Sequence, residues 1–159
     1  MSGSADKIRT RAAAVDWRQR QSGPVVFTNG VFDLLHPGHV DLLEAAREQG
    51  THLIVGLNSD ASARRLAKGP SRPVMGQTDR ARLLAALEAV DCVVVFDEPT
   101  PLELVRELRP DVLVKGGDYA PEDVVGGDVV RSSGGRVVIV PLVPGYSTTS
   151  IVERLRASS

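Results

Sequence analysis

The chain has 159 residues, a length typical of one domain, and it carries 19 Lys and Arg side chains against 20 Asp and Glu. A formal net charge of −1 gives no general attraction to nucleic acid or membrane surfaces, so we expect neither as a partner. The single cysteine excludes an internal disulfide, and the N-terminus lacks the apolar core of a signal peptide. We therefore expect a cytoplasmic protein.

The first 22 residues differ from the rest of the chain. Residues 6–21 predict a basic amphipathic helix with Ile8, Ala12 and Val15 on one side. Two interpretations are open for this helix: it packs on the outside of the domain, or it forms a dimer contact. We expect an N-terminal extension over residues 1–22 and one main domain over residues 23–159.

From residue 23 onward, apolar runs and helical segments alternate. The apolar runs are rich in valine and continuous, which is typical of strands covered on both faces. They comprise residues 25–27, 53–57, 92–96, 112–114 and 137–140. Helices are expected near residues 40–47, 79–90, 128–133 and 150–157, and another is expected to start at residues 100–103. This alternation predicts the α/β class, as a single Rossmann-like, doubly wound sandwich with a mainly parallel five-stranded sheet.

The helix expected over residues 79–90 has a clear apolar stripe. Leu83, Leu84, Leu87 and Val90 fall on one side, and Arg80 falls off it. In open sheets of this type, ligands bind beyond the carboxyl ends of the strands. Functional residues are therefore expected just past each strand, in segments 29–39, 58–60, 115–119 and 144–149 and at Asp97.

Segment 28–39, Thr-Asn-Gly-Val-Phe-Asp-Leu-Leu-His-Pro-Gly-His, is the most informative stretch. Pro37 fits the first helical position, which makes His36 the expected N-cap and puts His39 one turn further along. Gly38 removes a side chain between them. A helix start offers unpaired N–H groups to an anion, so the pair predicts phosphate binding. A surface pair and a zinc site are the alternatives, although no third zinc ligand is evident.

The same segment resembles the His-x-Gly-His motif of the cytidylyltransferase-like nucleotidyltransferases. These enzymes join a nucleoside triphosphate to a phosphorylated small molecule and release pyrophosphate. Three further stretches match in order: Lys-Gly-Pro-Ser-Arg-Pro-Val at 68–74, Leu-Val-Lys-Gly-Gly-Asp-Tyr at 113–119 and Gly-Tyr-Ser-Thr-Thr at 145–149. They are similar to the subgroup that acts on heptose phosphate, and the resemblance covers about residues 24–155. Met75 stands where that subgroup commonly has Asn, which weakens the assignment of the acceptor more than that of the reaction.

The resemblance implies a set of site residues. The implied catalytic residues are His36, His39 and Lys68. The implied nucleotide-binding residues are Thr28, Asn29, Gly30, Val31, Phe32, Gly38, Lys115, Gly117, Asp118, Tyr146, Ser147, Thr148 and Thr149. The implied substrate-binding residues are Asp33, Asn58, Arg72 and Arg80. Mg²⁺ is expected to arrive with ATP rather than in a metal site of the protein, and a homodimer or higher homo-oligomer is expected.

Several of these residues keep a second interpretation. Arg80 could lie on the surface, and Lys115 could form a buried pair with a carboxylate. Residues 147–149 could serve only to cap a helix. Asp118 could contact either the ribose or the metal. Asp33 is expected to orient a histidine or the loop backbone rather than to act as a base.

The resulting prediction is transfer of AMP from ATP to D-glycero-β-D-manno-heptose 1-phosphate, giving ADP-heptose and pyrophosphate. In the family this domain is often fused to a sugar kinase; the chain is too short to contain one, so we expect a separate kinase to make the substrate. One alternative is a cytidylyltransferase acting on glycerol phosphate or another alcohol phosphate. Another is a nucleotide-binding module without catalysis.

Overall fold

The structure, a computed structural model, describes residues 3–67, 72–142 and 144–158. The strands are β1 (Val25–Gly30), β2 (His52–Asn58), β3 (Cys92–Phe96), β4 (Val112–Gly116) and β5 (Arg136–Val140). The helices are α1 (Arg11–Gln19), α2 (Pro37–Arg47), α3 (Asp60–Leu66), α4 (Gln77–Ala86), α5 (Leu102–Leu108), α6 (Gly127–Ser132) and α7 (Thr148–Ala157). Two short 3-10 turns, η1 (Ser4–Lys7) and η2 (Pro121–Asp123), complete these elements.

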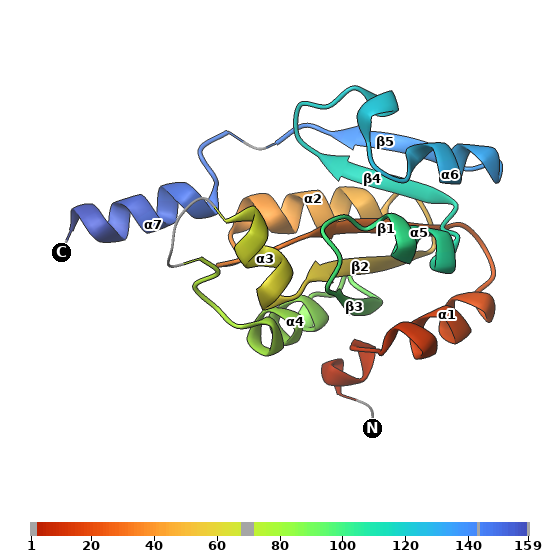
Figure 1. The fold of residues 1–159 in the computed structure, drawn as a ribbon, viewed down its shortest axis with the longest axis horizontal. Coiled ribbons are helices and arrows are strands. Elements are labelled where there is room, and N and C mark those ends of the chain that lie inside the picture. Colours follow the sequence, from red (N-terminus) through yellow and green to blue (C-terminus); the bar gives the residue numbers. More distant parts are fainter. Residues whose placement is uncertain (1–2, 68–71, 143, 159) are drawn as a thin grey trace.

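The described strands form one five-stranded sheet in the order β3-β2-β1-β4-β5, and every pair is parallel. The chain winds outward from β1 to β3, then crosses back to β4 and β5, so the strand order reverses between β1 and β4. The carboxyl ends of the strands point toward the side where α7 projects (Figure 1). The predicted doubly wound α/β architecture is confirmed, and the reversal marks where a ligand is expected.

Helices cover both faces of the sheet, as continuous apolar strands require. Along β1, Val26 faces one core while Val25 and Phe27 face the other, because successive side chains alternate. The first core receives Leu43 and Ala46 of α2 and Ala81, Leu84 and Ala85 of α4. The second receives Ala14 of α1, Leu104, Val105 and Leu108 of α5, and Val130 of α6. Each crossover helix therefore fixes the strand end and loop that precede it.

β1 and β4, which are neighbours in the sheet, separate toward their carboxyl ends. β1 pairs with β2 along its whole length, whereas its ladder with β4 ends at Phe27 and Leu113. Beyond that point the Thr28 hydroxyl donates a 2.8 Å hydrogen bond to the carbonyl of Val114. A side-chain hydrogen bond thus takes the place of the backbone hydrogen bonds between the two strands. The ends of β1 and β4 thus leave room between them for a cavity.

The N-terminal helix is shorter than predicted. Residues 6–21 do not form one helix: Thr10 caps α1 by accepting a hydrogen bond from the N–H of Ala13, and Ile8 lies before the helix in a parallel bridge with Val93. The prediction failed because Ile8 serves the sheet edge rather than the helix face. α1 packs against α5 and β3, on the outside of the domain.

Helix α4 presents a different face to the sheet than its apolar stripe predicted. It ends at Ala86, Leu83 is 42% exposed, and Arg80 is fully buried. The surface interpretation of Arg80 is therefore wrong; the guanidinium finds hydrogen-bond acceptors in the interior. Within the ranges that the structure describes, no helix has both the length and the apolar character needed to cross a bilayer.

Candidate active site

The start of α2 holds both histidines. His36 is the N-cap and Pro37 the first helical residue, as predicted. The Nδ1 atom of His36 accepts a 3.1 Å hydrogen bond from the N–H of Gly38, and the Nδ1 atom of His39 accepts a 3.3 Å bond from the N–H of His36. The rings are stacked, with centroids 3.8 Å apart and 22° between their planes. The two imidazoles therefore form one rigid unit.

These contacts also fix the protonation of the pair. Burial, with a smaller contribution from the ring of His36, lowers the pKa of His39 to about 4 against the opposing effect of Asp33. Burial lowers the pKa of His36 as well. Both rings are therefore neutral near pH 7, and because both Nδ1 atoms accept hydrogen bonds, the Nε2 atoms carry the ring protons and are donors. Two neutral donors are thus available to an anionic ligand.

The loop between β1 and α2 is held in an unusual conformation. Phe32 and Leu34 both have positive φ angles, 49° and 52°, a region that non-glycine residues rarely adopt. Phe32 is buried and meets the ring of His39 edge-on, with centroids 5.4 Å apart. Asp33 is 2% exposed and accepts hydrogen bonds from the backbone of the loop that precedes α4. Its predicted role in orienting loop backbone is confirmed.

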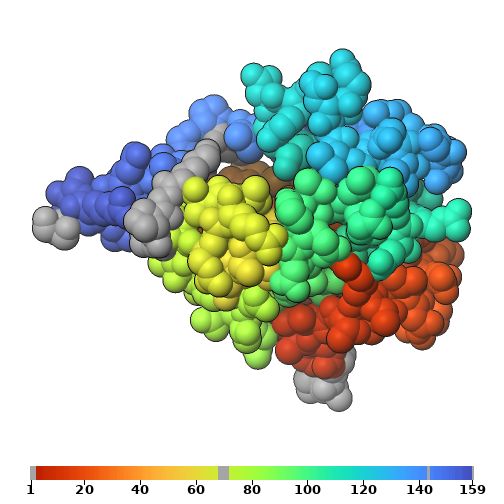
Figure 2. Space-filling view, in the orientation of Figure 1, coloured from red at the N-terminus to blue at the C-terminus, as the bar shows by residue number. Residues whose placement is uncertain are grey.

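A cavity of about 370 Å³, here called the strand-end cavity, lies where β1 and β4 separate. Five predicted residues line it: Asn29, Gly30, Val31, Asn58 and Lys115. Tyr119 also lines it and lies in the predicted segment 115–119. The rest of its wall was missed by the sequence reasoning and consists of Leu66, Pro99, Thr100, Pro101, Asp123, Val124 and Val125. Figure 2 shows the surface hollowed between α3 and the loop after β4. A mostly apolar wall together with the ammonium of Lys115 suits a flat ring attached to a polar group.

A second cavity of about 290 Å³, the histidine cavity, adjoins the first, since Val31 and Leu66 border both. Its predicted lining residues are Val31, Phe32, Asp33, His39, Arg72, Thr148 and Thr149. A third cavity of about 210 Å³ shares His39 and Thr148 with the second and also touches His36, Gly38, Tyr146 and Ser147. The three cavities follow one another around the histidine pair, which suits a ligand longer than a single ring.

Lys115 faces the strand-end cavity. Its ammonium lies 5.3 Å from the centroid of the Tyr119 ring, and burial lowers its pKa. No salt bridge joins it to a carboxylate in the described part of the chain, so the alternative of a buried ion pair is not supported. Lys115 is therefore a cation that burial disfavours and that an anionic ligand would stabilise.

The start of α7 closes the third cavity. Ser147 caps the helix by accepting a 3.0 Å hydrogen bond from the N–H of Ser150, so its capping role is confirmed. Thr148 donates its hydroxyl to the carbonyl of Asp33, which attaches α7 to the loop after β1. Tyr146 lies over His36 with 15° between the rings and 6.1 Å between their centroids. The segment thus serves as cap and as cavity wall at once.

Other predicted residues lie outside the cavities. Thr28 is 1% exposed and bonded to β4, and Arg80 is buried behind the site. Gly117 has a φ of +124°, so it forms the turn after β4, and Asp118 is exposed there. Lys68 lies outside the described residues. Among the described residues, no group of three or more His, Cys, Asp or Glu side chains could hold a metal ion, so the zinc interpretation finds no support there.

Comparison with known proteins places this geometry in a family. The family model described as "Cytidylyltransferase-like" matches residues 27–154. The chain is 59% identical over 152 residues to "Bifunctional protein HldE" of Syntrophotalea carbinolica, covering 94% of this chain and 31% of that protein. It is 58% identical to the protein of the same name in Magnetococcus marinus, covering 96% and 32%. The chain thus spans about a third of the length of these relatives.

Solved structures agree. The crystal structure of "the lipopolysaccharide core biosynthesis protein from Thermoplasma volcanium GSS1" is 27% identical, with a TM-score of 0.63 over 77% of this chain and 98% of that one. Pantoate-beta-alanine ligase from Francisella tularensis is 14% identical with a TM-score of 0.62 over 94% of this chain and 76% of that one, which shows the fold alone. The resemblance found in the four motifs is confirmed: the chain belongs to the cytidylyltransferase-like family.

Proposed function

We propose that this chain transfers AMP from ATP to D-glycero-β-D-manno-heptose 1-phosphate, giving ADP-heptose and pyrophosphate. An oxygen of the sugar phosphate forms a bond to the α-phosphorus of ATP. The bond from that phosphorus to the bridging oxygen breaks, and pyrophosphate leaves with the bonding electrons. The observation that carries the proposal is the stacked, neutral histidine pair between adjoining cavities. Two preorganised donors there can stabilise charge that develops on the phosphates.

The cavities support an assignment of the two substrates. The adenosine would occupy the strand-end cavity, which apolar side chains line together with Asn29, Gly30 and Lys115. The acceptor phosphate would bind in the histidine cavity, where Arg72 and the hydroxyl of Thr149 offer donors. The triphosphate would pass between them along His36 and His39. This arrangement needs positioning and charge neutralisation rather than a nucleophilic side chain.

Mg²⁺ is part of this proposal, as a companion of ATP. The described residues offer no cluster of metal ligands, which fits an ion held mainly by phosphate oxygens and water. The ion would neutralise triphosphate charge when bound. The expected homo-oligomer and the cytoplasmic location stay predictions; light scattering of the purified chain tests the first of them.

The heptose assignment rests on the motif resemblance and on relatives named "Bifunctional protein HldE", together with a structural neighbour named for lipopolysaccharide core biosynthesis. Pyrophosphate release is measured with ATP and with CTP across a panel of sugar 1-phosphates and glycerol 3-phosphate. We expect release with ATP and the heptose phosphate. Faster release with CTP and glycerol 3-phosphate would favour the cytidylyltransferase alternative, and ATP binding without release from any acceptor would favour a binding module.

His39→Ala is the matched variant for this assay. Loss of one preorganised donor costs roughly 10²–10³-fold in kcat. A variant that folds and releases pyrophosphate as fast as the parent chain contradicts the role assigned to the histidine pair. His52→Ala is the control, because His52 lies at the amino end of β2, away from the cavities, and meets the ring of Trp17 there.

A further inference from the structure

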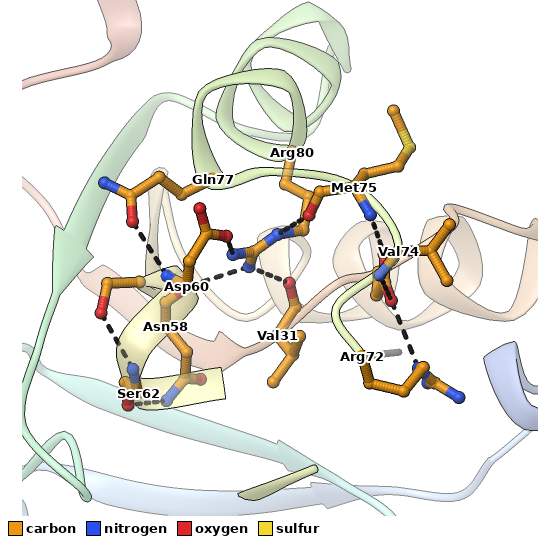
Figure 3. Close-up of polar contacts among 11 residues, drawn as sticks. Val31, Asn58, Asp60, Ser62, Arg72, Val74, Met75, Gln77 and Arg80 are labelled. Carbon is orange, nitrogen blue, oxygen red and sulfur yellow. Dashed lines mark hydrogen bonds and ion pairs between the residues drawn. The ribbon is translucent and has the colours of Figure 1, made fainter. Parts of the chain in front are cut away.

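Arg80 carries the most unusual set of contacts outside the cavities. It is the largest fully buried side chain among the described residues, and its guanidinium reaches four acceptors (Figure 3). Its Nε donates to the carbonyl of Met75 at 2.9 Å, and its Nη1 donates to the carbonyls of Val31 and Asn58, each at 2.8 Å. Its Nη2 pairs with the carboxylate of Asp60 at 2.7 Å. One side chain thus joins three segments that are separate in sequence: the loop after β1, the junction of β2 and α3, and the loop before α4.

Asp33 holds the same loop from the other side. Its two carboxylate oxygens accept hydrogen bonds from the N–H groups of Val74 and Met75, at 2.7 and 3.0 Å, and Arg72 lies within 3.3 Å. The peptide groups on both sides of Met75 are therefore fixed, the N–H by Asp33 and the carbonyl by Arg80. Because Asp33 and Val31 belong to one loop, the contacts close a ring that we call the Arg80 clamp.

The segments joined by the Arg80 clamp are the walls of the site. Val31 borders both the strand-end cavity and the histidine cavity, Asn58 lines the first, and Asp33 and Arg72 line the second. Arg80 itself lines neither. All but one of its N–H donors are directed at the protein, so the resemblance-based assignment of Arg80 as a substrate contact is not what its geometry favours.

A buried charge costs desolvation, and an apolar side chain of similar volume often stabilises such a position equally well or better. What the guanidinium adds is direction, because its planar fork fixes several acceptors at once, which the single nitrogen of lysine does not do. From this contrast we infer that Arg80 is a positioning residue. It fixes the walls of the two cavities relative to each other and thereby aligns the attacking phosphate with the nucleotide. The inference rests on the proposed function.

Arg80→Lys tests the clamp, with Arg82→Lys as the control on the exposed face of the same helix. Misplacement of reacting groups by about 1 Å costs roughly 10²-fold. We therefore expect kcat per folded molecule to fall at least about tenfold in Arg80→Lys, while KM for ATP changes much less. Hydrogen exchange in the segment that contains the amides of Val74 and Met75 should accelerate. The control should match the parent chain in all three measurements.

A folded Arg80→Lys variant with parental kcat, whatever its melting temperature, overturns the inference, and so does unchanged exchange at residues 74–75. If Arg80→Lys does not fold, Asp60→Ala removes one anchor of the guanidinium and leaves three carbonyls; parental kcat and exchange in that variant overturn the inference equally. A parent chain that releases no pyrophosphate from any sugar 1-phosphate defeats the proposed function instead, and the exchange measurement still tests the clamp.

Discussion

Gly38 is the position where a single methyl group tests the geometry of the histidine pair. A β carbon on Gly38 would lie 2.9 Å from Cε1 and 3.0 Å from Nδ1 of His36, and 3.0 Å from the β carbon of Tyr146. Carbon atoms pack at about 3.5–4.0 Å, so the ring of His36 has to move by roughly 0.5 Å or more. That shift strains its hydrogen bond to the N–H of residue 38 and its stacking on His39.

The expected cost follows from the role of the ring. Complete loss of one donor costs roughly 10²–10³-fold, and a displaced donor retains part of its effect, so Gly38→Ala should lower kcat by about 10- to 100-fold. This corresponds to roughly 1.4–2.7 kcal/mol of transition-state stabilisation. Stability should change little, because alanine favours a helix by up to about 1 kcal/mol over glycine and offsets the local strain.

The assay is pyrophosphate release with ATP and heptose 1-phosphate, read together with thermal denaturation. Gly76→Ala is the control: Gly76 has a φ of −67° as the N-cap of α4, and a β carbon there meets only a carboxylate oxygen of Asp60, at 3.8 Å. It should leave kcat unchanged. A folded Gly38→Ala variant with the kcat of the parent chain would show that the position of the His36 ring does not matter for the reaction.

Three further outcomes are expected. The pKa of His39 is about 4 in the folded chain against about 6.5 in the unfolded chain, so the unfolded chain binds more protons between these pH values. The contribution of neutral His39 to the free energy of unfolding should therefore rise with pH across that window. It should be fully present above about pH 6.5 and lost below about pH 4. Denaturation at a series of pH values checks this, and His39→Asn should flatten the profile. Lys115→Met should raise KM for ATP about tenfold, since a hydrogen bond to a charged group contributes roughly 1.5–3 kcal/mol. Thr10→Ala should lower the free energy of unfolding by about 1 kcal/mol without changing kcat, as calorimetry and the same assay would show.

The strands and the phosphate-binding loop could be predicted because their signals are local. A continuous apolar run followed by Pro37 at a helix start specifies strand, turn and N-cap within a dozen residues. All five strands begin within one residue of the predicted positions for the same reason. The order of the strands and the position of the site at the β1–β4 reversal then follow from the general behaviour of doubly wound sheets.

The burial of Arg80 could not be predicted, because its acceptors lie elsewhere in the chain. A helical pattern counts arginine as polar and assigns it to the surface, whereas one of its acceptors, Val31, is 49 positions away. The apolar wall of the strand-end cavity was missed for the same reason. Leu66, Pro99 and Val124 carry no motif and converge only when the end of α3 and two loops meet at one edge of the sheet.

The donors that the start of α2 offers to phosphate differ from those that the sequence predicted. The sequence predicted free backbone N–H groups there, but the N–H groups of His36 and Gly38 donate to the imidazoles, and those of His39 and Val40 donate to the carbonyl of His36. The backbone donors are thus used within the helix, and each imidazole accepts one through Nδ1 and presents Nε2–H outward. Protonation of either Nδ1 would remove an acceptor from the cap, so the neutral state that holds the helix start together is also the state that offers its donors to phosphate. Stability and activity should therefore decline over the same acidic range, and a variant that uncouples them would show that the cap and the ligand contacts are independent.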